Sequence, residues 1–293
     1  MPEPLVDRAP AKINLTLRVI GRRSDGYHEI ESLVAFARLG DRLSLAPGGE
    51  LALTVAGPTA AHAGADADNL VLKAARALAA RIPRLGLGAF HLDKELPVAA
   101  GLGGGSADAA AALRLLARAN GLAGDDPRLG EAARATGADV PVCLDPRLRV
   151  MRGIGEVLSA PLDLPPLPAV LANPGVALAT KAVFAGWRPG AVQPAELAAV
   201  MKPGSLKQTL DWLGRQSNDL EDAAIALKPV IGEVLAALRG LPGCKLARMS
   251  GSGATCFALF ATTSEAEAAA TRLAGEYPQW WVRATELGDA AKP

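Results

Sequence analysis

The 293-residue chain has few cysteines, few aromatic residues and almost no net charge. Cys143, Cys244 and Cys256 are an odd number without Cys-x-x-Cys spacing, which fits neither a disulfide framework nor a structural zinc site. We therefore expect a reducing, cytoplasmic environment. The 31 basic and 30 acidic side chains give a formal charge of +1, which argues against a polybasic nucleic-acid binder and against an acidic solvating tail.

Long apolar runs are also missing. No stretch of about 18 residues is free of charges and helix breakers, so we expect no membrane span, and residues 1–4 do not resemble the start of a secretory signal. Because aromatic residues make up only 4% of a chain that is 50% hydrophobic, small aliphatic side chains must form most of the core. At about 150 residues per domain the length predicts two domains. The prolines crowded between residues 161 and 168 place the boundary, giving domains over residues 1–161 and 162–293.

Predicted strands and helices alternate along the chain. Residues 11–19 alternate apolar and polar side chains, which predicts a strand with one buried face. Further strands are predicted over residues 30–36, 42–45, 51–56, 89–94, 153–158, 245–249, 255–260 and 281–284. Helices are predicted over residues 69–78, 106–120, 126–136, 180–184, 194–201, 205–213, 218–239 with a break at Pro229, and 264–276.

The most informative segment is residues 97–106, Pro-Val-Ala-Ala-Gly-Leu-Gly-Gly-Gly-Ser, between a predicted strand and a predicted helix. Its glycines let the backbone approach a ligand closely, and the N–H groups of a helix start suit a phosphate. Ser106 stands where a Rossmann fingerprint needs glycine, and no Walker Gly-Lys-Ser/Thr follows. The alternative is a loop that only lets an alanine-rich helix pack on a sheet. Asp108, in the predicted first helical turn, would repel an anion.

Three further groups are candidates for chemistry. Lys12 and Asn14 share a strand face, and taken alone the pair is better explained by a solvated outer face. Tyr27 and His28 lie in a predicted loop and could stack on and hydrogen-bond a heterocycle, or form an ordinary surface loop. Asp139 lies between a helix end and an apolar run, where it is a candidate base or magnesium neighbour, or a carboxylate of a helix-terminal turn.

Together and in this order, these segments resemble the galactokinase, homoserine kinase, mevalonate kinase and phosphomevalonate kinase superfamily of small-molecule ATP kinases. Residues 97–106 match its phosphate loop. Residues 9–15 and 23–28 resemble the branch that acts on a cytidyl alcohol. The match continues through residues 137–141, 153–156, 173–175, 217–220 and 250–254.

The resemblance implies a two-domain α+β kinase fold with the active site in the inter-domain cleft. It implies transfer of the γ-phosphate of ATP, with Mg²⁺, to the 2-hydroxyl of 4-diphosphocytidyl-2-C-methyl-D-erythritol, in the non-mevalonate route to isoprenoid precursors. The expected partner is this small molecule, with no nucleic acid and no membrane. Two alternatives stay open, namely a kinase for homoserine, mevalonate or a sugar, and a non-catalytic sensor of nucleotide or substrate.

The resemblance also implies roles for individual residues. Asp139 would take the proton of the acceptor hydroxyl, and Lys12 would keep Asp139 ionised and steady the phosphoryl group. Tyr27 and His28 would hold the cytosine. Asn14 would lie near the erythritol part, and Thr180 near the other side of the substrate. No metal ligand is assigned. The residues expected to wrap the ATP phosphates are Pro97, Val98, Ala99, Ala100, Gly101, Leu102, Gly103, Gly104, Gly105, Ser106 and Ala107.

Two departures from the family pattern concern ATP binding. Ala107 and Asp108 stand where related kinases often have serine and asparagine, which removes a hydroxyl and adds a negative charge near the nucleotide. Ala99 and Ala100 replace glycines seen in many relatives. We expect both departures to alter binding more than the type of reaction.

Overall fold

A computed structural model of the chain describes residues 3–63, 68–189 and 204–290. The helix expected over residues 194–201 lies outside the described residues. The chain forms two compact units, of which the first consists of Met1–Ala11, Leu39–Val98 and Gly103–Pro146, and the second of Lys12–Arg38, Ala99–Leu102 and Arg147–Pro293. These units are interleaved along the chain, whereas the sequence suggests one cut after residue 161; that cut stays a prediction.

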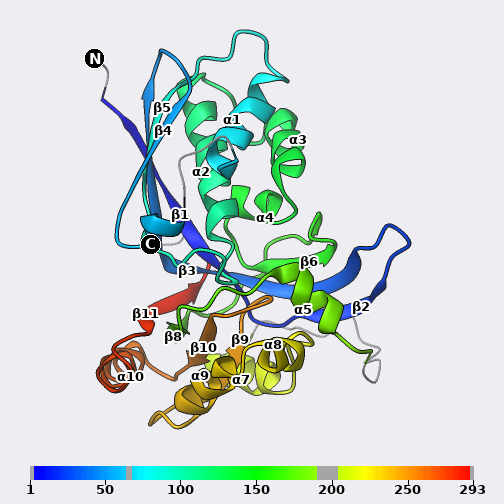
Figure 1. Cartoon of the computed structure of the whole chain (residues 1–293). Helices are drawn as coiled ribbons and strands as arrows, with labels where there is room; N and C mark the ends of the chain where they lie inside the picture. The colour runs from blue at the N-terminus through cyan, green and yellow to red at the C-terminus, as the bar shows by residue number, and fades with distance from the viewer. Residues whose placement is uncertain (1–2, 64–67, 190–203, 291–293) are drawn as a thin grey trace. The chain divides into compact units, whose positions relative to one another are not determined.

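Both units contain strands and helices (Figure 1). In chain order the described elements are β1 Leu5–Asn14, β2 Arg18–Arg22, β3 His28–Pro47, β4 Ala52–Ala56, η1 Ala60–His62, α1 Leu70–Ala79, β5 Gly88–Asp93, α2 Gly104–Ala119, α3 Pro127–Thr136, α4 Val140–Leu144, β6 Arg149–Gly153, β7 Val157–Leu158, β8 Leu167–Asn173, α5 Thr180–Gly186, α7 Leu206–Gly214, α8 Glu221–Leu227, α9 Val230–Arg239, β9 Leu246–Met249, β10 Cys256–Leu259, α10 Thr263–Glu276 and β11 Trp281–Gly288.

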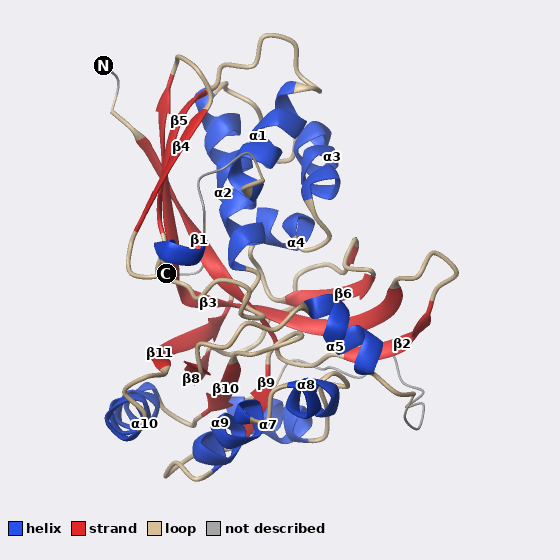
Figure 2. Cartoon of the chain, in the orientation of Figure 1, coloured by secondary structure: helices blue, strands red, loops and turns tan. Residues whose placement is uncertain are grey.

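In the first unit, helices α1 to α4 pack together beside a small sheet (Figure 2). Strand β5 pairs in parallel with β4 and antiparallel with residues 42–47 of β3. Helix α2 has ten buried residues, among them the alanines at residues 109–112, which let α1 and α4 approach closely. Helix α1 begins after Asn69, whose side chain accepts a hydrogen bond from the Val71 N–H and so caps the helix.

In the second unit, β8 is the fully buried strand of an antiparallel sheet. It pairs with β10 on one side and β11 on the other, and β10 pairs in turn with β9. Helix α9 packs on β9 and β10, and α10 packs on β8 and β11. The first half of β3 pairs with β2, β6 and β11. The predicted break at Pro229 is confirmed, since α8 ends at Leu227 and α9 begins at Val230.

The strand predicted over residues 11–19 is wrong in two respects. Strand β1 ends at Asn14 and β2 begins only at Arg18. The polar side chains are not a solvated face, because Lys12, Asn14 and Thr16 are 3%, 2% and 0% exposed. Alternation predicts one solvated face only when the polar side chains lack partners inside the protein, and here they have such partners.

The runs at residues 30–36 and 42–45 are one strand, β3, rather than two. Gly40 lies between them and looks like a break in the sequence. A Cβ atom at Gly40 would lie 2.3 Å from the carbonyl oxygen of Ala9. Glycine is therefore needed there for close approach of two backbones, and the strand continues through it.

Candidate functional site

The middle of the glycine-rich segment, residues 99–102, is held by a loop from the far end of the sequence. The Ser250 hydroxyl donates to the Gly101 carbonyl at 3.0 Å and accepts from the Asn14 N–H at 3.1 Å. The Thr255 N–H donates to the Ala100 carbonyl at 3.0 Å. One serine hydroxyl thus joins the glycine-rich segment to the end of β1. The sequence analysis placed residues 250–254 only within the family match and gave Ser250 no role.

The backbone of this segment is left-handed at three positions. Ala99, Gly101 and Gly103 have φ of +52°, +74° and +61°. A Cβ atom at Gly101 would lie 2.5 Å from the Ser250 carbonyl oxygen, so only glycine fits there. Ala99 carries a Cβ atom in a conformation that costs an L-residue about 1–2 kcal/mol. Replacing glycine by alanine therefore introduces backbone strain at residue 99. It introduces none of this kind at residue 100, because Ala100 has no positive φ.

Helix α2 begins at Gly104, two residues before the Ser106 that the sequence suggests. Its N-cap is Gly103, which has no side chain to cap the first turn. By helix geometry, the first four N–H groups lack partners within the helix and are available to an anion. The first of these belong to Gly104, Gly105 and Ser106. The glycine run is therefore the helix start itself.

A buried ionic triad lies next to this helix start. Lys94 donates to Asp108 at 2.9 Å and forms a close ion pair with Asp41, and the three side chains are 0–5% exposed. The other Asp41 oxygen accepts from the Glu95 and Leu96 N–H groups at 2.7 and 2.9 Å. Asp108 lies in the second turn of α2, so the expectation that it faces a bound anion from the first turn is wrong. The sequence analysis assigned no role to Lys94 or Asp41.

Burial and charge shift the pKa values of this triad in opposite directions. Burial raises the pKa of Asp108 to about 7; the Lys94 ammonium opposes this, and the Asp41 carboxylate adds to it. Burial lowers the pKa of Lys94, but the two carboxylates outweigh it, and the net pKa lies above the ordinary value. Lys94 therefore stays charged, while Asp108 titrates near neutral pH.

Lys12 and Asn14 lie together at the end of β1. The Lys12 ammonium donates to the Asn14 side-chain oxygen at 3.3 Å, and the Asn14 amide donates to the Ser32 hydroxyl at 2.7 Å. Asp139 is half-buried and is the N-cap residue of α4, directly before an apolar first turn. Lys12 belongs to the second unit and Asp139 to the first, and their pairing stays a prediction.

Aromatic side chains gather around His28 at the start of β3. The Phe184 ring lies 5.0 Å from the His28 ring, tilted by 30°, and the Trp187 ring meets it edge-on at 5.7 Å. Burial lowers the pKa of His28, and the charge of Arg22 lowers it further, so the imidazole is neutral at pH 7. Tyr27, the next residue, is 59% exposed. The sequence analysis missed Trp187, although its i, i+3 spacing from Phe184 was a signal.

Thr180 begins helix α5, and its hydroxyl oxygen lies 2.9 Å from the hydroxyl oxygen of Ser252. Ser252 belongs to the same loop that holds Gly101. The structure thus brings the start of α5, the Ser250 loop and the end of β1 together within the second unit. These are the predicted site residues that lie close to one another in that unit.

The segment over residues 217–220 fixes the Ser250 loop from behind. The Asn218 amide donates to the carbonyls of Met249 and Gly251, at 2.8 Å each, and its oxygen accepts from the Leu220 N–H. Asp219 accepts from the Val19 N–H at 2.9 Å. The sequence flagged this segment only as a family motif. Its structural role is to attach one loop to the strand that follows β1.

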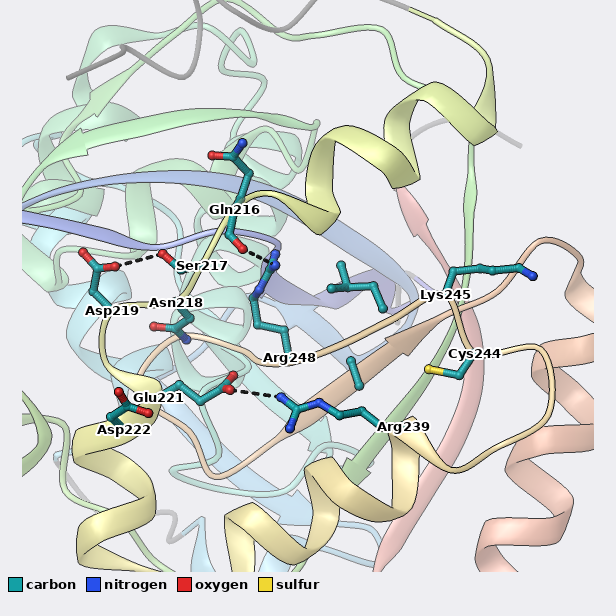
Figure 3. Close-up of a pocket in the computed structure, with 12 residues that line it drawn as sticks. Gln216, Ser217, Asn218, Asp219, Glu221, Asp222, Arg239, Cys244, Lys245 and Arg248 are labelled. Carbon is teal, nitrogen blue, oxygen red and sulfur yellow. Dashed lines mark hydrogen bonds and ion pairs between the residues drawn. The ribbon is translucent and has the colours of Figure 1, made fainter. Parts of the chain in front are cut away.

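A cavity of about 590 Å³ opens beside this segment (Figure 3). Arg239 and Glu221 pair across it at 3.4 Å, and the Arg248 guanidinium donates to the Leu15, Leu213 and Gln216 carbonyls. Burial lowers the pKa of Arg248 to about 10, although Glu221 opposes the shift. None of the predicted site residues lines the cavity, and its Glu221, Arg239 and Arg248 side chains bind one another or the backbone. We assign this cavity a structural role.

Among residues 3–63, 68–189 and 204–290, no group of three or more His, Cys, Asp or Glu side chains could hold a metal ion. Likewise, none of the helices described is both long and apolar enough to cross a membrane. Mg²⁺ keeps several waters and is often held by substrate phosphates with only one or two carboxylates. A magnesium ion that arrives on a nucleotide therefore does not need a cluster of three protein ligands.

Comparisons with known proteins agree with this arrangement. The family model of the GHMP kinases N terminal domain matches residues 69–145, and that of the GHMP kinases C terminal matches residues 197–279. A 4-diphosphocytidyl-2-C-methyl-D-erythritol kinase of Rhodopseudomonas palustris is 60% identical over 291 residues, 97% of each chain.

Solved structures give the same picture. A crystal structure of 4-(cytidine 5'-diphospho)-2C-methyl-D-erythritol kinase is 36% identical and has a TM-score of 0.76, over 97% of this chain and 99% of that one. The homoserine kinase of Cytophaga hutchinsonii has a TM-score of 0.73 at 20% identity, over 99% and 96%, and shares the fold. The expected α+β kinase fold is thereby confirmed.

Proposed function

Because the chain belongs to the family of 4-diphosphocytidyl-2-C-methyl-D-erythritol kinases, we propose that it transfers the γ-phosphate of ATP to the 2-hydroxyl of that cytidyl alcohol. The protein is an ATP-dependent kinase of the GHMP type. The observation that carries the assignment is 60% identity over nearly the full length, with the glycine-rich segment at the start of α2. The reaction releases ADP and the 2-phosphate, a step toward isoprenoid precursors.

ATP would bind with its phosphates against residues 97–107. Free N–H groups at the start of α2 and the left-handed glycines let the backbone surround phosphate oxygens. The Ser250 hydroxyl holds Gly101 in the required conformation before the nucleotide arrives. Such preorganised donors are the main catalytic resource in phosphoryl transfer, which needs little covalent chemistry from the protein.

Lys12 and Asp139 would carry the reaction. Asp139 would accept the proton of the acceptor hydroxyl as that oxygen attacks the γ-phosphorus, and Lys12 would stabilise the charge on the transferring phosphoryl group. The Asn14 oxygen, which accepts from the Lys12 ammonium at 3.3 Å, supports this by orienting it. Asn14 would also lie near the erythritol part of the acceptor. The prediction that Lys12 keeps Asp139 ionised belongs to the same proposal.

The cytosine would bind at the aromatic cluster of His28, Phe184 and Trp187, with Tyr27 beside it. A neutral His28 can both donate and accept a hydrogen bond, as an aminopyrimidine requires. Exposed Tyr27 has a ring face available for stacking, and base-on-aromatic stacking contributes about 1–3 kcal/mol per base. Thr180, at the start of the helix that carries Phe184, would contact the other side of the substrate.

Mg²⁺ would be held mainly by the ATP phosphates and water, and it would neutralise charge on the nucleotide. We assign no side chain to it. The cytoplasm is the proposed location, since Cys143, Cys244 and Cys256 are all free thiols. The proposed partner is the cytidyl substrate rather than a nucleic acid or a membrane.

The test is ADP release by the purified protein with ATP and Mg²⁺. The acceptors compared in parallel are 4-diphosphocytidyl-2-C-methyl-D-erythritol, homoserine, mevalonate and galactose. We expect turnover with the cytidyl alcohol alone. Turnover of another alcohol would move the substrate assignment within the superfamily, and folded, ATP-binding protein that turns over none of the four would favour a sensor.

A further inference from the structure

The triad of Asp41, Lys94 and Asp108 ties together the two ends of the glycine-rich segment. Asp41 accepts from the N–H groups of Glu95 and Leu96, which directly precede the segment. Lys94 bridges Asp41 to Asp108, which follows the segment within α2. All of these residues belong to the first unit. The triad therefore fixes the distance between the segment's entry and its exit.

The triad also lies close to Gly104, the first residue of α2. A Cβ atom placed on Gly104 would be 3.5 Å from the Lys94 Nζ and 3.7 Å from an Asp41 oxygen. Two carboxylates and one ammonium leave a net charge of −1 when every group is ionised. Any negative charge here lies beside the helix start that would receive the ATP phosphates, so its presence or absence changes the field at that point.

One oxygen of the triad has no stabilising contact. Asp108 is 3% exposed, and of the buried polar atoms in the described residues its Oδ1 is one that has no hydrogen-bond partner. A buried carboxylate oxygen without a donor favours the protonated form of the group. Protonation at Oδ1 leaves Oδ2 free to accept from Lys94 and brings the net charge of the triad to zero.

The charged groups that face Asp108, within the described ranges, are Asp41 on β3 and Lys94 just after β5. Four ion pairs on the surrounding helices involve other residues, namely Lys73 with Asp68, Arg81 with Glu131, Arg114 with Asp7, and Arg128 with Asp126. Titration of Asp108 therefore depends on its burial and on the charges of Lys94 and Asp41.

We propose that Asp108 is a positioning residue whose proton sets the strength of nucleotide binding. When Asp108 is protonated, the triad connects both ends of the phosphate loop and carries no net charge. When Asp108 is ionised, a buried negative charge beside Gly104 repels the ATP phosphates and weakens ATP binding. The proposal rests on the proposed function, because it takes residues 97–107 as the phosphate loop.

The experiment compares the wild type with Asp108→Asn from pH 6 to pH 8.5, measuring kcat and KM for ATP and for the cytidyl alcohol. Asparagine keeps the shape and lacks the charge. At each pH the KM for ATP of the wild type is divided by that of D108N. We expect this ratio to rise about fivefold across the range, the order expected for one added charge at an effective dielectric constant of ~20. The KM for the cytidyl alcohol should show no such trend.

Asp126→Asn is the matched control. Asp126 caps α3 in the same unit, and hydrogen bonds from Arg128 lower its pKa to about 2, so its charge is constant across this range. D126N should follow the wild-type profile. A D108N profile parallel to the wild type, or equal changes in KM for both substrates, would overturn the proposal.

A direct titration of each protein with ATP, without acceptor, separates this proposal from the proposed function. If the cytidyl alcohol is not phosphorylated while ATP affinity shows the expected dependence on Asp108, only the substrate assignment fails. If D108N does not fold, the ratio is taken between the wild type and Asp108→Ser, which also lacks the charge. A flat ratio there would equally contradict the proposal.

Discussion

Ala99 occupies a backbone conformation that favours glycine, whereas its neighbour Ala100 does not. Ala99→Gly should relieve the left-handed strain, while the greater chain entropy of glycine in the unfolded state offsets part of the gain. We therefore expect the free energy of unfolding to stay the same or to rise by up to about 1 kcal/mol, with a Tm that is unchanged or slightly raised. Ala100→Gly gains no such relief and removes a buried methyl group, so its Tm should fall. Thermal melting of both variants checks this, and equal losses would show that residue 99 is not strained.

Asp139 is the proposed base. Asp139→Asn cannot accept the proton, so we expect kcat to fall about 10²–10⁴-fold with little change in the affinity for ATP. Single-turnover rates and an ATP titration measure the two quantities separately. Full retained turnover would remove Asp139 from this role.

His28 is the centre of the aromatic cluster. His28→Ala should raise the KM for the cytidyl alcohol about tenfold, the order expected for losing one base-stacking contact, and leave the KM for ATP nearly unchanged. Steady-state kinetics with each substrate varied in turn test this. Equal effects on both substrates would contradict cytosine recognition at this cluster.

Sequence reasoning found these residues but not their surroundings. Asn14 and Lys12 stand out as polar residues in an apolar strand. The pattern cannot reveal that both are buried, with Asn14 hydrogen-bonded to Lys12, Ser32 and Ser250. Asp41 and Lys94 are 53 residues apart and belong to no recognisable motif. Such pairs arise only from the folded chain, and a single sequence contains no signal of them.

Among the elements, the loop between β9 and β10 depends on one side chain outside it. Asn218→Ala removes donors from the buried Met249 and Gly251 carbonyls, which should cost about 2–3 kcal/mol of unfolding free energy. It should also raise the KM for ATP, because this loop carries the Ser250 hydroxyl that holds Gly101. Denaturant unfolding and ATP kinetics measure the two effects.

Gln216→Ala is the nearby control for this element. The side chain of Gln216 makes one long hydrogen bond to Trp212, and Arg248 binds the Gln216 backbone carbonyl, which the substitution keeps. We expect a small loss of stability and an unchanged KM for ATP. An equally large effect of both variants would argue that the segment has no specific link to the loop.

Most elements were predictable because each has a local signal. Asn69 and Asp126 cap their helices, and Pro127 stands in the first turn of α3. The elements that were not predictable involve distant chain segments. Strand β3 continues through Gly40 because the Ala9 backbone lies against it, and no local pattern distinguishes this glycine from one that ends a strand.

For the molecule as a whole, Asp108 makes stability depend on pH in an unusual direction. Its pKa is about 7 in the folded protein and 3.8 ordinarily, so between these values the folded state binds more protons than the unfolded state. The free energy of unfolding therefore falls as the pH rises from about 4 to about 7. D108N should lose this part of the slope.

Melting curves of the wild type and D108N at pH 5 to pH 8 measure this contribution. At about 2–4 °C per kcal/mol for a chain of this size, we expect the Tm of the wild type relative to D108N to decrease by several degrees across the range. Parallel curves would show that Asp108 is ionised to the same extent in both states.

The family and the fold class could be predicted from the sequence, because the order of its motifs spans nearly the whole chain. The interleaving of the two compact units has no such signal in the sequence, since β1 and β3 each contribute residues to both units.

The hydrogen bond between Ser250 and Gly101 joins residues that are 149 positions apart. Contacts of such long sequence separation form late, since the intervening chain must first be brought together. A nascent chain that has emerged only as far as α4 already contains every residue of the proposed phosphate loop and still lacks the Ser250 hydroxyl that holds Gly101. We therefore expect residues 99–102 to reach their final conformation only after Ser250 has been synthesised.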